Sequence, residues 1–112
     1  MTIEEWQSEV DQWIKEVGVR YYNEKTNTLL LTEEVGEFAR IIAREYGEQS
    51  WKNPPEPGEV NQQLADELSD IIWVATCLAN QLGINLSSAL KANMIKKTSR
   101  DKERHEQNLK LK

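Results

Sequence analysis

The stretch TEEVGEFAR, Thr32 to Arg40, places three glutamates within five positions of an expected helix. Further along the chain, ADELSDIIWV, Ala65 to Val74, carries three more carboxylates in the same rhythm. Charged residues on a helix usually form a solvated face. The side of each helix on which these acids lie therefore decides whether the two clusters are solvent-exposed surface residues or two halves of one site.

Length and composition indicate one globular domain covering residues 1–112, with 38% hydrophobic and 29% charged residues. The net charge of −5 is unevenly distributed, because the segment from Lys91 onward is rich in lysine and arginine and the acidic excess lies upstream. An acidic chain with one basic strip is a poor candidate for general nucleic-acid binding. It is a fair candidate for handling a metal and a phosphate. The charged tail from about residue 101 is expected to fray.

A single cysteine, Cys77, lies in an apolar run and cannot form an intrachain disulfide. This favours a small buried residue in a reducing, cytoplasmic compartment. The N-terminal segment MTIEEWQSEV is acidic and has no apolar core, so we expect no signal peptide. No apolar stretch approaches membrane-spanning length, and no membrane partner is expected.

Helical periodicity runs through almost the whole chain, so the predicted fold class is all-α, a bundle of four helices. Thr2 with Glu5 three residues later forms a capping-box pattern. The segment GEQSWKNPPEPGE holds all three prolines and is the one clear loop, whereas VRYYNEKTNT is read as an irregular link. The expected helices run from Thr2 to near Gly18, roughly from Asn27 to Tyr46, roughly from Glu59 to Leu82, and onward from a cap at Asn85 or Ser87.

Placing the acids at about 100° of rotation per residue puts several of them in or beside apolar faces. On the second helix Glu34 falls inside the apolar stripe, Glu37 lies at its edge, and Glu33 points toward the polar side. The stripe itself comprises Leu30, Leu31, Phe38, Ile41 and Ile42.

On the third helix, Glu67 borders a predicted core stripe and Asp70 lies one turn further along, whereas Asp66 faces away. That stripe comprises Leu64, Leu68, Ile71, Ala75, Leu78 and Leu82. Burying unpaired, adjacent carboxylates costs several kcal/mol, so either a divalent cation or basic side chains must offset it. Four converging carboxylates suit Mg²⁺, or Mn²⁺.

The alternative is internal ion pairing with Arg40, Arg44 or lysines of the fourth helix, and the pattern alone leaves it open. Di-iron chemistry is disfavoured, because those sites use Glu-x-x-His pairs and the only histidine, His105, lies in the charged tail.

The motifs EEVGE, Glu33 to Glu37, and ELSD, Glu67 to Asp70, resemble the EExxE…ExxD signature of MazG-like nucleotide pyrophosphohydrolases, an all-α superfamily. The resemblance covers most of the chain. It includes the leucine run TLLLTEEVGE, the proline loop after SWK, the helix DELSDIIWV and the basic segment ALKANMIKKTSRD after the turn LGINL.

The resemblance implies a helical bundle that assembles as homodimers or homotetramers, with an active site lined by the acidic helices and closed by a neighbouring subunit. By motif position, the Mg²⁺ ligands would be Glu34, Glu37, Glu67 and Asp70. Glu33 would support the ligands or activate water. The implied reaction cleaves a nucleoside triphosphate into the monophosphate and pyrophosphate, for clearance of surplus or non-canonical nucleotides. Some relatives act on phosphoribosyl nucleotides instead.

Basic residues of the fourth helix are candidates to hold the pyrophosphate leaving group. Lys97 and Arg100, which lie one turn apart, are our choice, with Lys96 or Asn93 as further candidates. The alternative is a solvated helix end that complements the helix dipole.

The four tryptophans suggest different roles. Trp6 and Trp13 share the apolar side of the first helix and indicate core or interface packing. Trp51, in the proline loop, could cover a nucleobase or simply pack. Trp73 lies opposite the core stripe of the third helix, which predicts that this helix is buried on two sides, the second by another subunit. A non-catalytic helical interaction module remains the competing hypothesis.

Overall fold

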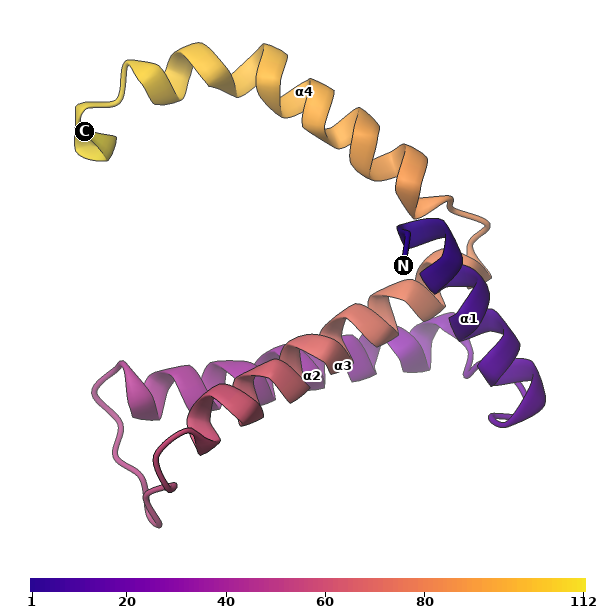
Figure 1. Cartoon of the computed structure of the whole chain (residues 1–112), viewed down its shortest axis with the longest axis horizontal. Helices are drawn as coiled ribbons and strands as arrows, with labels where there is room; N and C mark the ends of the chain where they lie inside the picture. The colour runs from indigo at the N-terminus through magenta and orange to yellow at the C-terminus, as the bar shows by residue number, and fades with distance from the viewer.

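The computed structural model describes residues 1–112, and it is all-helical, as predicted (Figure 1). None of the helices combines the length and the apolar character that a membrane-spanning segment needs. The helices are α1 (Ile3–Glu16), α2 (Glu24–Glu45), α3 (Glu59–Gln81) and α4 (Leu86–Glu106), followed by a short 3₁₀ helix, η1 (Leu109–Leu111).

Side-chain caps set where three of the helices begin. The Thr2 hydroxyl accepts the Glu5 amide at 3.0 Å, and Asn85 caps α4 by accepting the Ser88 amide at 3.0 Å. The predicted start of the second helix near Asn27 is wrong, because Asn23 accepts the Thr26 amide at 2.8 Å and starts α2 at Glu24. Helix α4 continues to Glu106, so residues 101–106 of the charged tail are helical.

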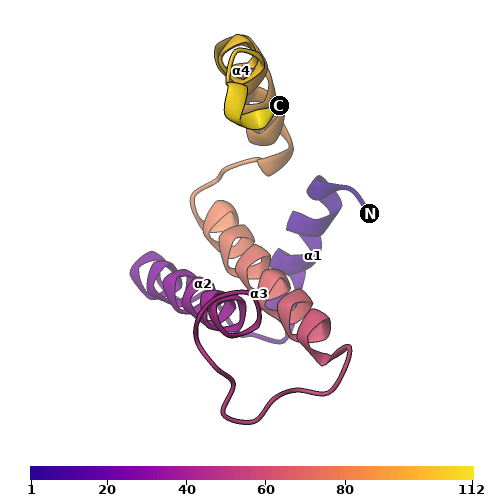
Figure 2. The ribbon, with the colours of Figure 1, turned by 90° about the vertical axis from the view of Figure 1, so that its left-hand side faces the viewer.

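Helices α2 and α3 run antiparallel, side by side along most of their length, and share the most extensive contact in the molecule (Figure 1). Helix α1 packs across α3 near its C-terminal end, where Gln7 Nε2 donates to the Ile84 carbonyl and its Oε1 accepts from the Leu86 amide. Beyond that turn, α4 projects away from the α2–α3 pair (Figure 2). The body of the molecule is therefore α1, α2 and α3.

The small core lies between α1 and α3. Val10, Ile14 and Cys77 are its buried centre, and the rings of Trp6 and Trp13 meet Trp73 edge-on at centroid separations of 6.0 and 5.3 Å. Cys77 is buried as predicted, and burial raises the pKa of its thiol to about 11.

The predicted division of the two apolar faces of α3 is wrong. Trp73 faces α1 of its own chain and not another subunit. Two members of the predicted core stripe, Leu68 and Leu82, are 46% and 59% exposed, and the neighbouring Ile72 is 55% exposed. The physical reason is that α1 packs on the tryptophan side, which leaves part of the leucine stripe without a partner in this chain.

A prediction concerns Thr76, which joins α1 to α3. Its buried hydroxyl accepts the indole N–H of Trp6 at 2.8 Å and donates to the Ile72 carbonyl at 2.7 Å. Thr76→Val keeps the shape but leaves the indole N–H unpaired, so we expect the free energy of unfolding to fall by about 1–2 kcal/mol in urea denaturation.

The matched control is Thr28→Val, because the exposed Thr28 hydroxyl donates to the Glu24 carbonyl at 2.8 Å in the same local geometry but supports no second helix. We expect little change there. Equal losses at the two positions would contradict a role for the Trp6–Thr76 bond.

Candidate active site

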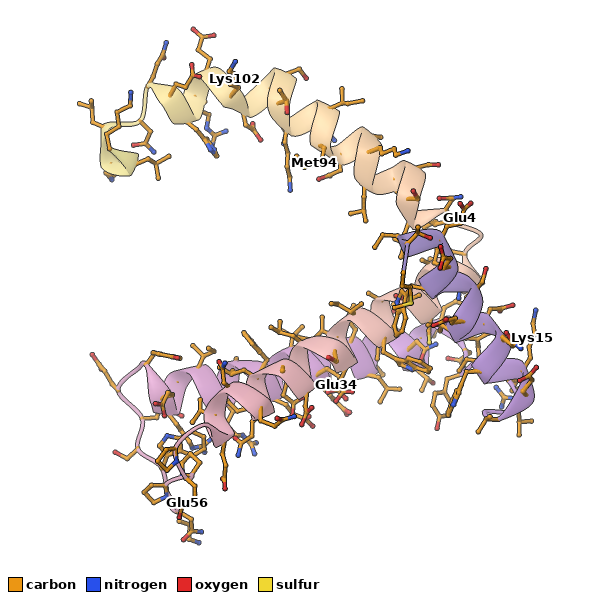
Figure 3. The ribbon with its side chains drawn as sticks, viewed as in Figure 1. Glu4, Lys15, Glu34, Glu56, Met94 and Lys102 are labelled. Carbon is orange, nitrogen blue, oxygen red and sulfur yellow. The ribbon has the colours of Figure 1, made fainter.

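Carboxylates from α2 and α3 converge midway along the paired helices, where Glu34 lies (Figure 3). Glu34, Glu67 and Asp70 each offer an oxygen atom, and these three atoms lie within 4.8 Å of one another. The first two side chains are half-buried and Asp70 is exposed. The packing of α2 on α3 therefore brings these three acids together.

Two oxygens of the cluster have no hydrogen-bond partner although they are fully buried. They are Oε2 of Glu34 and Oε2 of Glu67. The suggested ion pairs with Arg40 or Arg44 do not form, because the salt bridges of the structure are Lys15–Asp11 and Arg100–Asp101. A divalent cation with oxygen ligands fits this donor set, since buried anionic oxygens without a partner are costly to the fold.

The pKa values of the cluster respond to this crowding. Burial, the close approach of the Glu67 carboxyl, and the charges of Glu37 and Asp70 raise the pKa of Glu34 to about 7. Burial raises the pKa of Glu67 as well, reinforced by Glu37 and Asp70. Glu37 therefore contributes its charge to the cluster, although it is exposed. Glu33 is exposed and outside the group of three.

The basic candidates lie far from these acids within one chain. Asn93, Lys96, Lys97 and Arg100 are all exposed on α4, which extends away from α2 and α3 (Figure 3). Arg100 pairs with its neighbour Asp101 at 3.1 Å. A single chain does not bring the acidic and basic groups into one site.

Trp51 stands in the loop between α2 and α3, where its indole N–H donates to Oε2 of Glu45 at 3.2 Å. It does not line the cavity described next.

An apolar cavity of about 500 Å³ opens beside the acidic cluster, and Glu34 belongs to both. Tyr21 and Tyr22 in the link between α1 and α2 contribute to its wall, as do Trp13 of α1 and Trp73 of α3. The complete lining is Trp13, Ile14, Gly18, Val19, Arg20, Tyr21, Tyr22, Asn27, Leu30, Glu34, Trp73, Val74 and Cys77.

Helical periodicity alone does not predict this cavity, because VRYYNEKTNT reads only as a loop or irregular link. The signal present in the sequence was the pair of adjacent tyrosines in a segment without helical periodicity. Val19 adds a structural signal, because it adopts a φ of 72°. A β-branched residue in the left-handed region is strained, and such strain clusters at functional sites.

Most of the chain matches a known protein family. The family model for the MazG nucleotide pyrophosphohydrolase domain matches residues 22–105, which include all of α2, α3 and the acidic cluster. The chain belongs to this family, as the two acidic motifs indicated.

Two relatives and two solved structures are similar to this chain over most of its length. YpjD from Bacillus subtilis (strain 168) is 36% identical, with 92% of this chain and 89% of that protein covered, and YvdC of the same organism is 30% identical, with 83% and 93% covered. The crystal structure of B. subtilis YpjD has a TM-score of 0.74 at 34% identity, covering 90% of this chain and 97% of that one. The Bacillus-conserved MazG protein, described as a nucleotide pyrophosphohydrolase, has a TM-score of 0.72 at 33% identity, covering 92% and 96%.

A prediction follows from the raised pKa of Glu34. An acid whose folded-state pKa lies above its ordinary value near 4.5 stabilises the fold in its protonated form. That stabilisation is fully present below the ordinary pKa and is lost as the pH rises toward 7 and beyond. The side chain of Glu34→Gln does not ionise. With EDTA present, its melting temperature should therefore exceed that of the wild type by a margin that grows between about pH 5 and pH 8.

The control is Asp66→Asn, an exposed acid on α3 that lies outside the cluster. Its melting temperature should differ from the wild type by a constant amount over the same range. A constant difference for Glu34→Gln as well would show that Glu34 ionises normally.

Proposed function

We propose that this protein is a Mg²⁺-dependent nucleoside triphosphate pyrophosphohydrolase, which releases a nucleoside monophosphate and pyrophosphate. The observation that supports this most directly is the pair of buried, unpartnered oxygens of Glu34 and Glu67 at the edge of an apolar cavity. A carboxylate cluster suits Mg²⁺, with Mn²⁺ as a substitute, and an apolar cavity suits a nucleobase.

The residues proposed to hold the metal are Glu34, Glu37, Glu67 and Asp70. When bound, the ion would neutralise charge on the triphosphate and lower the pKa of an attacking water. The protein supplies the rest: α2 and α3 fix the carboxylates, and Glu34 links the cluster to the cavity. Glu33 remains a candidate to orient the water from the outer side of α2.

The nucleobase is proposed to occupy the apolar cavity and not the loop that carries Trp51. Support comes from the aromatic lining, since Trp13, Tyr21, Tyr22 and Trp73 all contribute to the wall. Flat aromatic and apolar surfaces bind bases with little preference by themselves.

The pyrophosphate is proposed to bind to Lys97 and Arg100 of a second copy of the chain, with Asn93 or Lys96 assisting. Within one chain α4 stands away from the acids, and it exposes Leu90, Met94 and Ile95 at 48%, 64% and 70%. The leucine stripe of α3 is also partly exposed. Covering both in a homodimer or homotetramer would bury apolar surface and supply cations to the acidic site.

The activity is tested by pyrophosphate release from a panel of NTPs and dNTPs, with Mg²⁺ and with EDTA. We expect release only with Mg²⁺. Glu67→Gln should lower kcat/KM by at least about 100-fold, because even residues that only support metal ligands are worth about 10–100-fold.

Asp66→Asn is the matched control and should retain wild-type activity, since Asp66 is exposed and outside the cluster. No release from any nucleotide, by a folded protein whose melting temperature ignores Mg²⁺, would favour a non-catalytic helical module.

The contribution across subunits is tested by mixing two inactive proteins, Glu67→Gln and the double variant Lys97→Ala/Arg100→Ala, through refolding together. If the acids and the cations of one site come from different copies, half of the refolded dimers contain one chain of each variant. One of the two sites in such a dimer is intact. Activity should then recover to about one quarter of the wild type. If both sets act within one chain, mixing restores nothing.

A further inference from the structure

Asn27 is the one amide side chain in the cavity wall, and its orientation is fixed by its neighbours. It is 4% exposed, and its Nδ2 donates to Oε1 of Gln81 at 2.7 Å and to the Tyr22 carbonyl at 3.4 Å. The Nε2 of Gln81 donates to the same Tyr22 carbonyl. Because a backbone carbonyl can only accept hydrogen bonds, both amide nitrogens must face Tyr22.

The remaining polar atom of Asn27, Oδ1, accepts no hydrogen bond from the protein. It is not sealed off either, since the fully buried side-chain oxygens without a partner are only those of Glu34 and Glu67. Asn27 lines the cavity, and Oδ1 is its one polar side-chain atom without a partner in the protein. The cavity wall thus contains an amide oxygen that can accept a hydrogen bond, whereas the nitrogen of the same amide is already hydrogen-bonded.

We propose that Asn27 Oδ1 reads the nucleobase and that the cavity selects bases with an exocyclic amino group, as in cytosine and adenine, over their keto counterparts uracil and hypoxanthine. This inference rests on the proposed function and adds a preference to it. An amino group donates to Oδ1, whereas a keto oxygen in its place sets two acceptors against each other. A free asparagine would rotate to donate instead, but the bonds to Gln81 and Tyr22 prevent that.

The spacing along α2 suits this role. Asn27 and Glu34 are seven residues apart, which is two turns of helix or about 10 Å, and both line the cavity. A nucleoside monophosphate spans a comparable length from its base edge to its phosphate. A base at Asn27 would therefore bring the α-phosphate to the acidic cluster.

The test compares kcat/KM for two matched pairs, dCTP against dUTP and dATP against dITP. We expect the wild type to favour the amino member of each pair by about tenfold or more, because a buried acceptor left unpaired is costly. Gln81→Met should reduce this preference toward parity, since it removes the acceptor that fixes Asn27 Nδ2 and lets the amide turn.

Gln12→Met is the control, because Gln12 bonds only to Glu16 on the surface of α1. It should leave both ratios at wild-type values. Preference for the keto members, or an unchanged ratio in Gln81→Met, would overturn the assignment.

A second readout separates this inference from the proposed function. Trp13 and Trp73 line the cavity, so quenching of tryptophan fluorescence reports binding of dCMP and dUMP without hydrolysis. Tighter binding of dCMP, with no pyrophosphate release from any triphosphate, would support the proposed base preference and overturn the proposed reaction. Pyrophosphate release with equal binding of dCMP and dUMP would support the proposed reaction and overturn the base preference.

Discussion

The contact between α2 and α3 holds the carboxyl groups of Glu34 and Glu67 close together, with one oxygen of each fully buried. Two acids in that position repel each other when ionised, and neither finds a basic partner. Helix pairing must therefore hold them there against an electrostatic cost. A fold selected for stability alone would place apolar residues at these positions, so the arrangement is understandable as a site for a cation.

The acidic cluster could be predicted from sequence because it depends on local geometry. Glu34 and Glu67 lie within or beside apolar stripes, and one turn of helix relates them to Glu37 and Asp70. The packing partner of each apolar face could not be predicted in the same way. A helical wheel of α3 shows two apolar sides, but only the tertiary structure decides that α1 takes the side of Trp73.

The cavity depends even more on tertiary structure. Its wall combines α1, the link that contains Tyr21 and Tyr22, α2 and α3, so no single segment carries its pattern. The start of α2 was missed for a smaller reason. Both Asn23 and Asn27 are plausible caps in the sequence. In the structure Asn23 Oδ1 accepts the Thr26 amide, and the Asn27 amide already bonds to the Asn23 carbonyl inside the helix.

The main tertiary contacts of helix α4 are with α1, where Gln7 binds the Leu86 amide, and with η1. In an isolated chain its backbone hydrogen bonds would be protected by little more than helix propensity, whereas most helical stability in proteins comes from tertiary packing. Its amide protons should then exchange with solvent far faster than those of α3, although both segments are equally helical. Opening of α4 would proceed without disturbing α1, α2 and α3, which makes it a separate unit of local stability whose protection reports on assembly with other chains.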